Sequence, residues 1–346
     1  MEPIPFVDVR QGGPMAHVKA RIATAHALRD ACLAPVPNWG RNVLRPIDYL
    51  AGNWLKKSAS LYREELESIA EYLGFPGAMT LNLSYLFACT TAADIDSCGR
   101  PLIRRSLDWP FHGLGRCVEI AWQSGPAGNY HNVTWPGSVG VLSAMAPGRF
   151  AAVINAAPME RRTEVSWGLP YDLALNIRKA LTRAGDWPPD HLLRYVFENC
   201  ANFEQAIEVL SQEPLARSAL FTITGVNADE IAVVERTESK ARVIRGPVTV
   251  ANDWQKPEMG WKARMGHENN VARRQAMLDV ENINEPFSWA KPPVLNKLTR
   301  LAVEMSAADD GILHARGYES GSLFKMAVPA TLDFSLQHEK VLSLVA

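Results

Sequence analysis

The chain contains 346 residues, of which 47% are hydrophobic and 21% are charged. That size suits one large core or two modest domains, and the composition excludes a disordered chain, which needs low hydrophobicity and a high net charge. The 36 Lys and Arg residues nearly balance the 37 Asp and Glu residues, so the formal net charge is −1. Because proteins that bind nucleic acids or membrane surfaces usually carry a basic surplus, neither partner is expected.

The cysteines argue against a disulfide framework and against a zinc site. Their number is odd, and no two form a Cys-x-x-Cys pair; they lie at positions 32, 89, 98, 117 and 200. The N-terminal sequence has no charged and apolar leader, and no run of about eighteen apolar residues could span a membrane. The expected compartment is therefore a reducing cytoplasm.

Helices are predicted for roughly the first eighty residues. The stretches 17–32 and 47–73 are rich in helix-forming residues, and the second ends in an apolar stripe that includes Leu66, Ile69 and Leu73. Gly74 follows as a stop signal. Residues 79–91 then have the composition of a strand.

Strands and helices alternate in blocks through the rest of the chain. Short strands are predicted at 102–108, 116–123, 130–135, 139–146, 150–155, 220–224, 231–236 and 241–251. Helices are predicted at 173–184, 202–210 and 272–280, followed by a loop with two prolines, a further helical stretch and a last pair of strands. In the second of these helices, Asn202 is expected to form the cap, with Gln205 three positions later, and the apolar face is expected to comprise Phe203, Ile207 and Leu210. Such grouping predicts the α+β class, with layered and mostly antiparallel sheets. Gly113 and Gly115 lack the third glycine and the helix of a phosphate loop, so a turn is expected there.

Cys89 ends an apolar segment, where an isolated cysteine is usually a small buried hydrophobic residue. Arg105 and Asp108 lie on a predicted strand and are three positions apart, which places them on opposite faces. For both side chains to reach one site, the strand would have to end or bulge between them.

These residues carry a resemblance to a known family. The segments 82–91 and 99–109 resemble the start of the mature β-subunit in acid ceramidase and N-acylethanolamine acid amidase. Those enzymes are cysteine N-terminal-nucleophile (Ntn) hydrolases, with penicillin V acylase and conjugated bile acid hydrolase as more distant relatives. Their nucleophilic Cys is followed sixteen positions later by Arg and nineteen positions later by Asp, the spacing of Cys89, Arg105 and Asp108.

Further blocks follow in the same order along the chain. The glycine-bounded segment ending at Asn155 and the strand ending at Asn252 are similar to the two active-site Asn segments of the family, and Arg273 is similar to the Arg that follows, with Arg274 as a close alternative. Segments 62–74 and 291–299 also resemble family blocks. The resemblance implies an αββα sandwich of two antiparallel sheets. It also implies a helical N-terminal segment, 1–88, cleaved on maturation from a catalytic core, 89–346.

The resemblance also implies a mechanism. Cutting the Ala88–Cys89 bond frees the α-amine of Cys89, which can accept the thiol proton without any histidine. Asp108 is expected to hold that amine and Arg105 to favour the thiolate. Oxyanion donors are expected from the Asn252 side chain and from the backbone near Asn155, with Arg273 bracing the site or binding substrate. No metal or cofactor is expected.

The implied function is that of a self-processing amidohydrolase that cleaves N-acyl amides, above all fatty-acyl amides, through a thioester on Cys89. The substrate could equally be an N-acyl amino acid or a cyclic amide. Two alternatives stay open, an acyltransferase that uses the same thioester and a relative that is neither processed nor catalytic. The expected partner is a small N-acyl amide, and the two fragments of a processed chain would stay associated.

Overall fold

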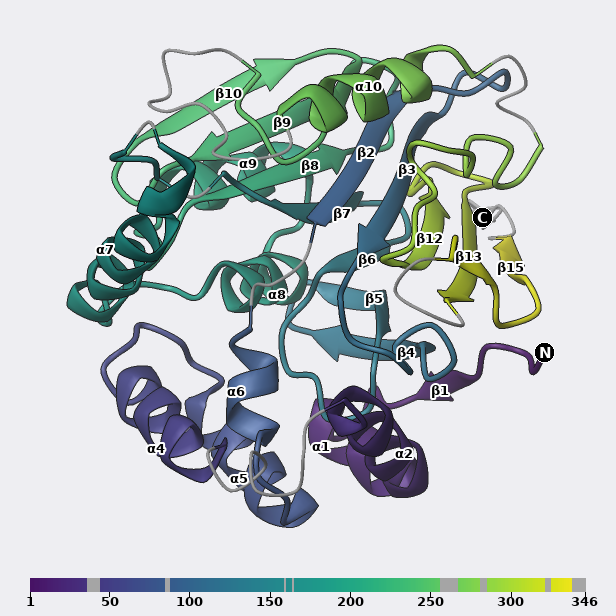
Figure 1. Ribbon diagram of the computed structural model, residues 1–346. Helices are drawn as coiled ribbons and strands as arrows, with labels where there is room; N and C mark the ends of the chain where they lie inside the picture. The colour runs from purple at the N-terminus through teal and green to yellow at the C-terminus, as the bar shows by residue number, and fades with distance from the viewer. Residues whose placement is uncertain are drawn as a thin grey trace.

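Two β-sheets pack face to face between outer layers of helices in the computed structural model (Figure 1). The structure describes residues 1–35, 44–84, 88–158, 160–163, 165–255, 267–280, 285–320 and 325–337. This arrangement is the αββα sandwich, so the fold class expected from the sequence is confirmed.

The first sheet has the strand order β1-β4-β5-β6-β7-β8-β9-β10. Its strands pair antiparallel, except that β1 lies parallel to β4. The bounds are Phe6–Asp8 (β1), Glu119–Gly125 (β4), Gly128–Thr134 (β5), Ser143–Ala146 (β6), Phe150–Ala156 (β7), Ala219–Thr224 (β8), Ile231–Arg236 (β9) and Ala241–Arg245 (β10).

The second sheet has the order β11-β2-β3-β12-β13-β14, and β15 also pairs with β13. All of these pairs are antiparallel. The bounds are Ala88–Ile95 (β2), Pro101–Asp108 (β3), Val248–Val250 (β11), Thr299–Met305 (β12), Ile312–Glu319 (β13), Val328–Pro329 (β14) and Phe334–Gln337 (β15). The helical stretch expected after the two prolines is therefore wrong, because the chain enters β12 there.

Helices cover the outer face of each sheet. Pro189–Asn199 (α8) and Phe203–Gln212 (α9) pack on the first sheet, and His267–Leu278 (α10) packs on β2 and β11 of the second. The predicted cap of α9 is confirmed, because the Asn202 side chain accepts a hydrogen bond from the Gln205 N–H at 3.0 Å. Its apolar face is buried on the sheet, as the periodicity predicted.

The N-terminal segment is largely helical, as predicted, and its structure differs from the prediction in four places. Its helices are Gly13–Ala20 (α1), Ile22–Leu33 (α2), Leu44–Leu55 (α4), Arg63–Leu73 (α5) and Ala78–Asn82 (α6). The predicted stretch 17–32 is thus split into α1 and α2, the stretch 47–73 is split into α4 and α5, and β1 is a strand. The strand-like stretch opens as α6, because the Asp48 carboxylate caps the N–H groups of Gly77 at 2.5 Å and Thr80 at 2.9 Å.

Buried polar contacts fasten this segment to the rest of the chain. Arg194 of α8 pairs with Glu65 of α5 and, at 2.7 Å, with Glu198, while the Tyr62 hydroxyl donates to Glu198 at 2.6 Å. Apolar residues of both parts also form one continuous core. Residues 1–84 and the two sheets are therefore packed as one body.

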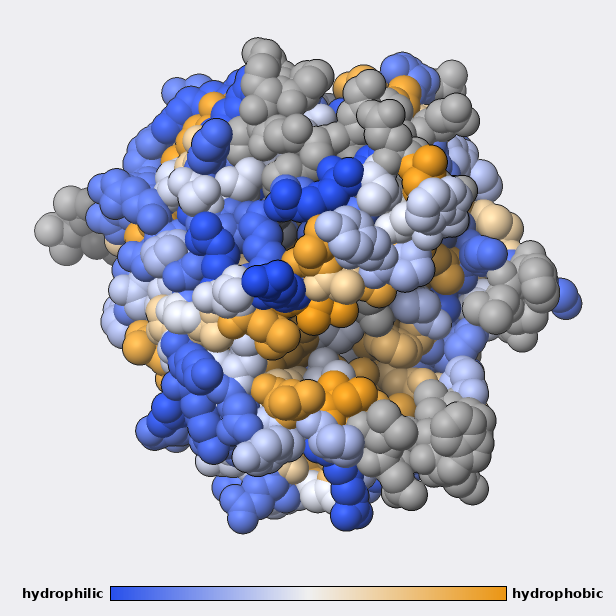
Figure 2. All heavy atoms as spheres, turned by 60° about the vertical axis from the view of Figure 1, so that its left-hand side comes forward, coloured by the Kyte–Doolittle hydropathy of each residue, from blue (hydrophilic) through white to orange (hydrophobic). Residues whose placement is uncertain are grey.

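Helix α7 (Leu169–Thr182) follows a short 3-10 turn at Ser166–Gly168. It is amphipathic, but it exposes its apolar side instead of burying it. Its apolar residues Leu173, Ile177 and Leu181 are exposed, whereas Asp172 is buried and accepts bonds from nearby backbone N–H groups. Figure 2 shows apolar side chains gathered in the middle of the face on which α4 and α7 lie. Across the described chain, no helix combines the length and apolarity needed to cross a bilayer.

Candidate active site

Cys89 is the second residue of β2 and is fully buried between the two sheets. It pairs with Leu107 of β3, the strand that also carries Arg105. The guanidinium of Arg105 is fully buried as well, and its Nη2 donates to Cys89 Sγ at 3.1 Å. The two residues that the sequence set sixteen positions apart are therefore in direct contact.

Two further bonds fix the Arg105 guanidinium beside the sulfur. Nη1 donates to Ser143 Oγ at 2.6 Å, and Nη2 also donates to the carbonyl oxygen of Ile154 at 3.2 Å. Burial raises the pKa of the Cys89 thiol, and the nearby Arg105 cation opposes that rise. Arg105 thus lowers the pKa of the thiol, as expected, but burial raises this pKa by more in the uncut chain.

Asp108 approaches Cys89 from the other face of the sheet. Strand β3 runs without interruption from Pro101 to Asp108, so the predicted break between Arg105 and Asp108 is wrong. The irregularity lies instead in β12, where the register shifts between Thr299 and Leu301. No break is needed, because Arg105 lies on the face of the sheet that carries the Cys89 side chain. Asp108 lies on the opposite face, next to the backbone of Cys89.

Three residues surround the buried carboxylate of Asp108. Thr299 Oγ1 donates to Oδ1 at 2.8 Å, Asn296 Nδ2 donates to Oδ2 at 2.7 Å, and Arg273 Nη1 lies 3.5 Å from Oδ2. Burial raises the pKa of Asp108, whereas the Arg273 cation and the two hydrogen bonds lower it. A buried carboxylate held by so many donors is an anchor for a positive group.

Asn252 and Arg273 hold the backbone of Cys89. The Cys89 N–H donates to Asn252 Oδ1 at 3.0 Å, and Arg273 Nη1 donates to the Cys89 carbonyl oxygen at 3.0 Å. Arg273 Nη2 also donates to Asn252 Oδ1. The amide Nδ2 of Asn252 donates to the Ala156 carbonyl oxygen at 2.8 Å. The face of Asn252 turned to Cys89 is therefore an acceptor, and not the oxyanion donor that the resemblance implied.

Asn155 ties the two sheets together beside the site. Its Oδ1 accepts a bond from Thr91 Oγ1 at 2.8 Å, and its Nδ2 donates to the carbonyl oxygen of Ala251 at 3.1 Å. The side chain is fully buried. Both ends of the amide are thus engaged in positioning β2, β7 and the end of β11.

Of the five residues predicted to act with Cys89, three contact it directly: Arg105, Asn252 and Arg273. Asp108 is linked to it through Arg273, and Asn155 binds Thr91, two residues after Cys89 on β2. Arg274 lies apart, paired with Asp253 at 3.3 Å, so Arg273 is the arginine at the site. The site also contains polar residues that were not predicted from the sequence. They are Thr91, Ser143, Asn270, Asn296 and Thr299. Asn296 and Thr299 lie inside the segment 291–299, which resembles a block of the family, so that resemblance could have pointed to them.

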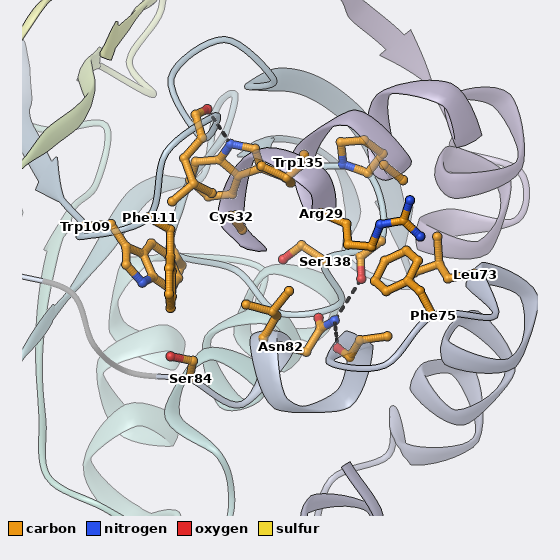
Figure 3. A pocket seen from close by; sticks show the side chains of 18 of the residues that line it. Arg29, Cys32, Leu73, Phe75, Asn82, Ser84, Trp109, Phe111, Trp135 and Ser138 are labelled. Carbon is orange, nitrogen blue, oxygen red and sulfur yellow. Dashed lines mark hydrogen bonds between the residues drawn. The ribbon is translucent and has the colours of Figure 1, made fainter. Parts of the chain in front are cut away.

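A mostly apolar cavity opens beside these strands (Figure 3). Its walls come from α2, the segment Leu73–Ser84 and the loops after β3 and β5, and include Leu28, Leu73, Phe75, Leu81, Trp109, Phe111, Leu114, Trp135 and Leu142. Trp109 follows Asp108 directly, and Leu142 precedes Ser143, which binds Arg105. Two residues of the cavity wall are therefore sequence neighbours of residues at the site, whereas Cys89 itself is fully buried and does not line the cavity.

The chain is similar in sequence to three kinds of known protein. The family model described as acyl-coenzyme A:6-aminopenicillanic acid acyl-transferase matches residues 178–286. The N-acylethanolamine-hydrolyzing acid amidase of Rattus norvegicus is 24% identical over 310 residues, or 84% of this chain and 79% of the relative. A probable acid ceramidase of Caenorhabditis elegans is 26% identical over 265 residues, or 70% of this chain and 60% of that protein.

A solved structure agrees with the fold. The Caenorhabditis elegans ortholog of N-acylethanolamine-hydrolyzing acid amidase superposes with a TM-score of 0.51 at 19% identity, covering 63% of this chain and 93% of that one. The chain is therefore similar to Ntn hydrolases in sequence and in fold. The resemblance predicted from the Cys89, Arg105 and Asp108 spacing is thereby confirmed.

Proposed function

We propose that this chain is a self-processing cysteine amidase of the Ntn-hydrolase type that cleaves N-acyl amides through a thioester on Cys89. The observation that carries the proposal is the environment of that residue. Its sulfur lies 3.1 Å from the Arg105 guanidinium, and its backbone nitrogen donates to Asn252. Amide hydrolysis is also the activity for which two relatives are named, the N-acylethanolamine-hydrolyzing acid amidases.

Maturation would begin with the peptide bond before Cys89. Sγ attacks the carbonyl carbon of Ala88, the C–N bond breaks, and the acyl group moves from nitrogen to sulfur. Water then hydrolyses the thioester, which leaves a carboxylate on Ala88 and restores the thiol. The freed α-amine of Cys89, whose ordinary pKa is about 7.7–8.0, becomes the base that the buried thiol lacks.

Turnover would repeat the chemistry on an external amide. The α-amine takes the thiol proton, the thiolate attacks the amide carbonyl, and the ammonium returns a proton to the leaving amine. Arg105 stabilises the thiolate, whereas Asp108, through Arg273, holds the Cys89 backbone in place. Water completes the cycle by hydrolysing the acyl thioester.

The apolar cavity supports an acyl group as the part of the substrate that is bound there. Aromatic and aliphatic side chains dominate its walls, and they come from both the N-terminal segment and the core. A fatty or aromatic acyl chain would bury its surface against them, with the scissile carbonyl at the end next to Trp109. Cleavage would then leave an enzyme that needs both fragments to bind its substrate.

An acyltransferase is the second candidate, because the matched family model describes acyl transfer. Both activities pass through the same thioester, and they differ in whether water or an amine accepts the acyl group. Hydrolysis of an N-acylethanolamide in the presence of increasing concentrations of a primary amine separates them. A product that stays free acid supports the amidase, and a product that becomes the new amide supports the transferase.

A further inference from the structure

The apolar cavity that Trp109 lines has a charged end. Among the described residues that line it, Arg29 and Asp190 carry charge. Asp190 is 5% exposed and its carboxylate is packed against Gly140. Arg29 is 25% exposed at the side chain and stands over the ring of Phe75, with its guanidinium carbon 4.9 Å from the ring centroid. Arg29 is therefore the charged group that a bound molecule can reach.

Arg29 lies at the end of the cavity away from Trp109. In Figure 3, Trp109, Phe111 and Ser84 are on one side of the cavity, and Arg29, Leu73 and Phe75 are on the other. Trp109 and Ser84 are the lining residues that border the segments carrying Asp108 and Cys89. An acyl chain whose carbonyl carbon reaches Cys89 would thus extend along the apolar walls toward Arg29.

The contacts of Arg29 leave it suited to bind an anion. Its Nε donates to Asp30 at 2.8 Å, but the Asp30 side chain is 62% exposed, so water competes for that bond. The aliphatic stem lies along the cavity, and the aromatic face of Phe75 orients the guanidinium. A guanidinium fixed at the rim of an apolar cavity matches a carboxylate in geometry and in charge.

We propose that Arg29 recognises an anionic group at the far end of the acyl chain, so that the preferred substrates are amides of acyl groups bearing a terminal carboxylate. This inference rests on the proposed amidase function, since it assumes that the acyl group occupies the cavity. It assigns to α2 of the N-terminal segment a specificity-determining residue.

Two ethanolamides of equal chain length test the proposal, one ending in a methyl group and the other in a carboxylate. Their binding to Cys89→Ala, which cannot turn them over, is measured by titration calorimetry with and without Arg29→Gln. The change is expected to weaken binding of the carboxylate-terminated amide about tenfold or more, and to leave the methyl-terminated amide within about twofold. Arg178→Gln, at an exposed arginine of α7 outside the cavity, is the matched control and should change neither.

Equal weakening of both ligands, no weakening of either, or no binding of either overturns the proposal. A third ligand, an N-acylglycine with a methyl-terminated chain, checks the orientation. If Arg29→Gln weakens that ligand as strongly, Arg29 reads the leaving amine and the proposal also fails. Hydrolysis by the wild-type protein is scored separately: amides that bind in an Arg29-dependent way but are not cleaved contradict the amidase function and leave the assignment of Arg29 standing.

Discussion

The sulfur of Cys89 lies 3.1 Å from Nη2 of Arg105, a residue of the neighbouring strand. Both side chains are fully buried, so the cation acts on the thiol with little screening by water. Burial raises the pKa of Cys89, and this contact with the Arg105 cation opposes that rise.

Replacing Arg105 with methionine is therefore expected to raise the pKa of Cys89 further. In the processed enzyme, the acidic limb of the pH profile of kcat/KM should move to higher pH, and the rate at neutral pH should fall by up to about tenfold for each unit of displacement. Arg104→Met is the matched control. Arg104 immediately precedes Arg105, is also buried, and pairs with Asp94 on the other face of the sheet. The same displacement in both variants would contradict a specific role for Arg105.

The ionised carboxylate of Asp108 is expected to destabilise the folded protein, although the site requires it. Burial raises its pKa above the ordinary 3.8, so its contribution to folding is fully present below that value and is lost as the pH rises through the raised pKa. Asp108→Asn should thus gain stability relative to wild type as the pH increases, while processing and hydrolysis fall. Denaturant unfolding across the acidic to neutral range measures the first effect.

Asp8 provides the control of opposite sign for that experiment. Its pKa is lowered by hydrogen bonds from Arg10, so its favourable contribution appears as the pH rises. Asp8→Asn should lose relative stability with rising pH and leave processing unchanged. If the Asp108→Asn curve runs parallel to that of Asp8→Asn, the carboxylate of Asp108 is stabilising and the argument above is wrong.

Asn252 presents its oxygen to Cys89 and its nitrogen to Ala156. Asn252→Asp keeps the acceptor and removes the donor, whereas Asn252→Leu removes both. If the side chain positions the Cys89 nitrogen, Asn252→Asp should still be processed and Asn252→Leu should not. Mass spectrometry scores processing, and an oxyanion role in turnover would appear as a loss of about 10²–10³ in kcat for the processed Asn252→Asp enzyme.

The contacts of Tyr62 test how the N-terminal segment is held. Its hydroxyl donates to Glu198 at 2.6 Å in a buried network, and Tyr62→Phe leaves that carboxylate with one donor fewer. The free energy of unfolding should fall by about 1–3 kcal/mol, and a processed variant should lose fragment 1–88 more readily on gel filtration. Tyr72→Phe, at a residue 46% exposed, should have neither effect.

Local patterns predicted the elements that depend on local interactions. The stripe of Leu66, Ile69 and Leu73 marks α5, and Gly74 ends that helix with a positive φ of 66°. Asn202 marks the start of α9. In these cases the residues that decide the structure are within a few positions of the element itself.

The misses involve contacts between residues far apart in the sequence. Helix α6 is capped by Asp48, about 30 residues earlier, and β1 is a strand because it pairs with β4. The shift in β12 that brings Thr299 to Asp108 has no local signature. For the same reason the spacing from Cys89 could identify Arg105 and Asp108, but not the faces from which they approach.

The mass of the purified protein tests the central claim most directly. Wild type is expected to give two species whose boundary lies between Ala88 and Cys89, and Cys89→Ala is expected to give one species of full length. Cys98→Ala, at an exposed cysteine outside the site, should be cut like wild type. A wild-type chain that stays intact at every pH tested, or a Cys89→Ala chain that is still cut at this bond, would contradict the account.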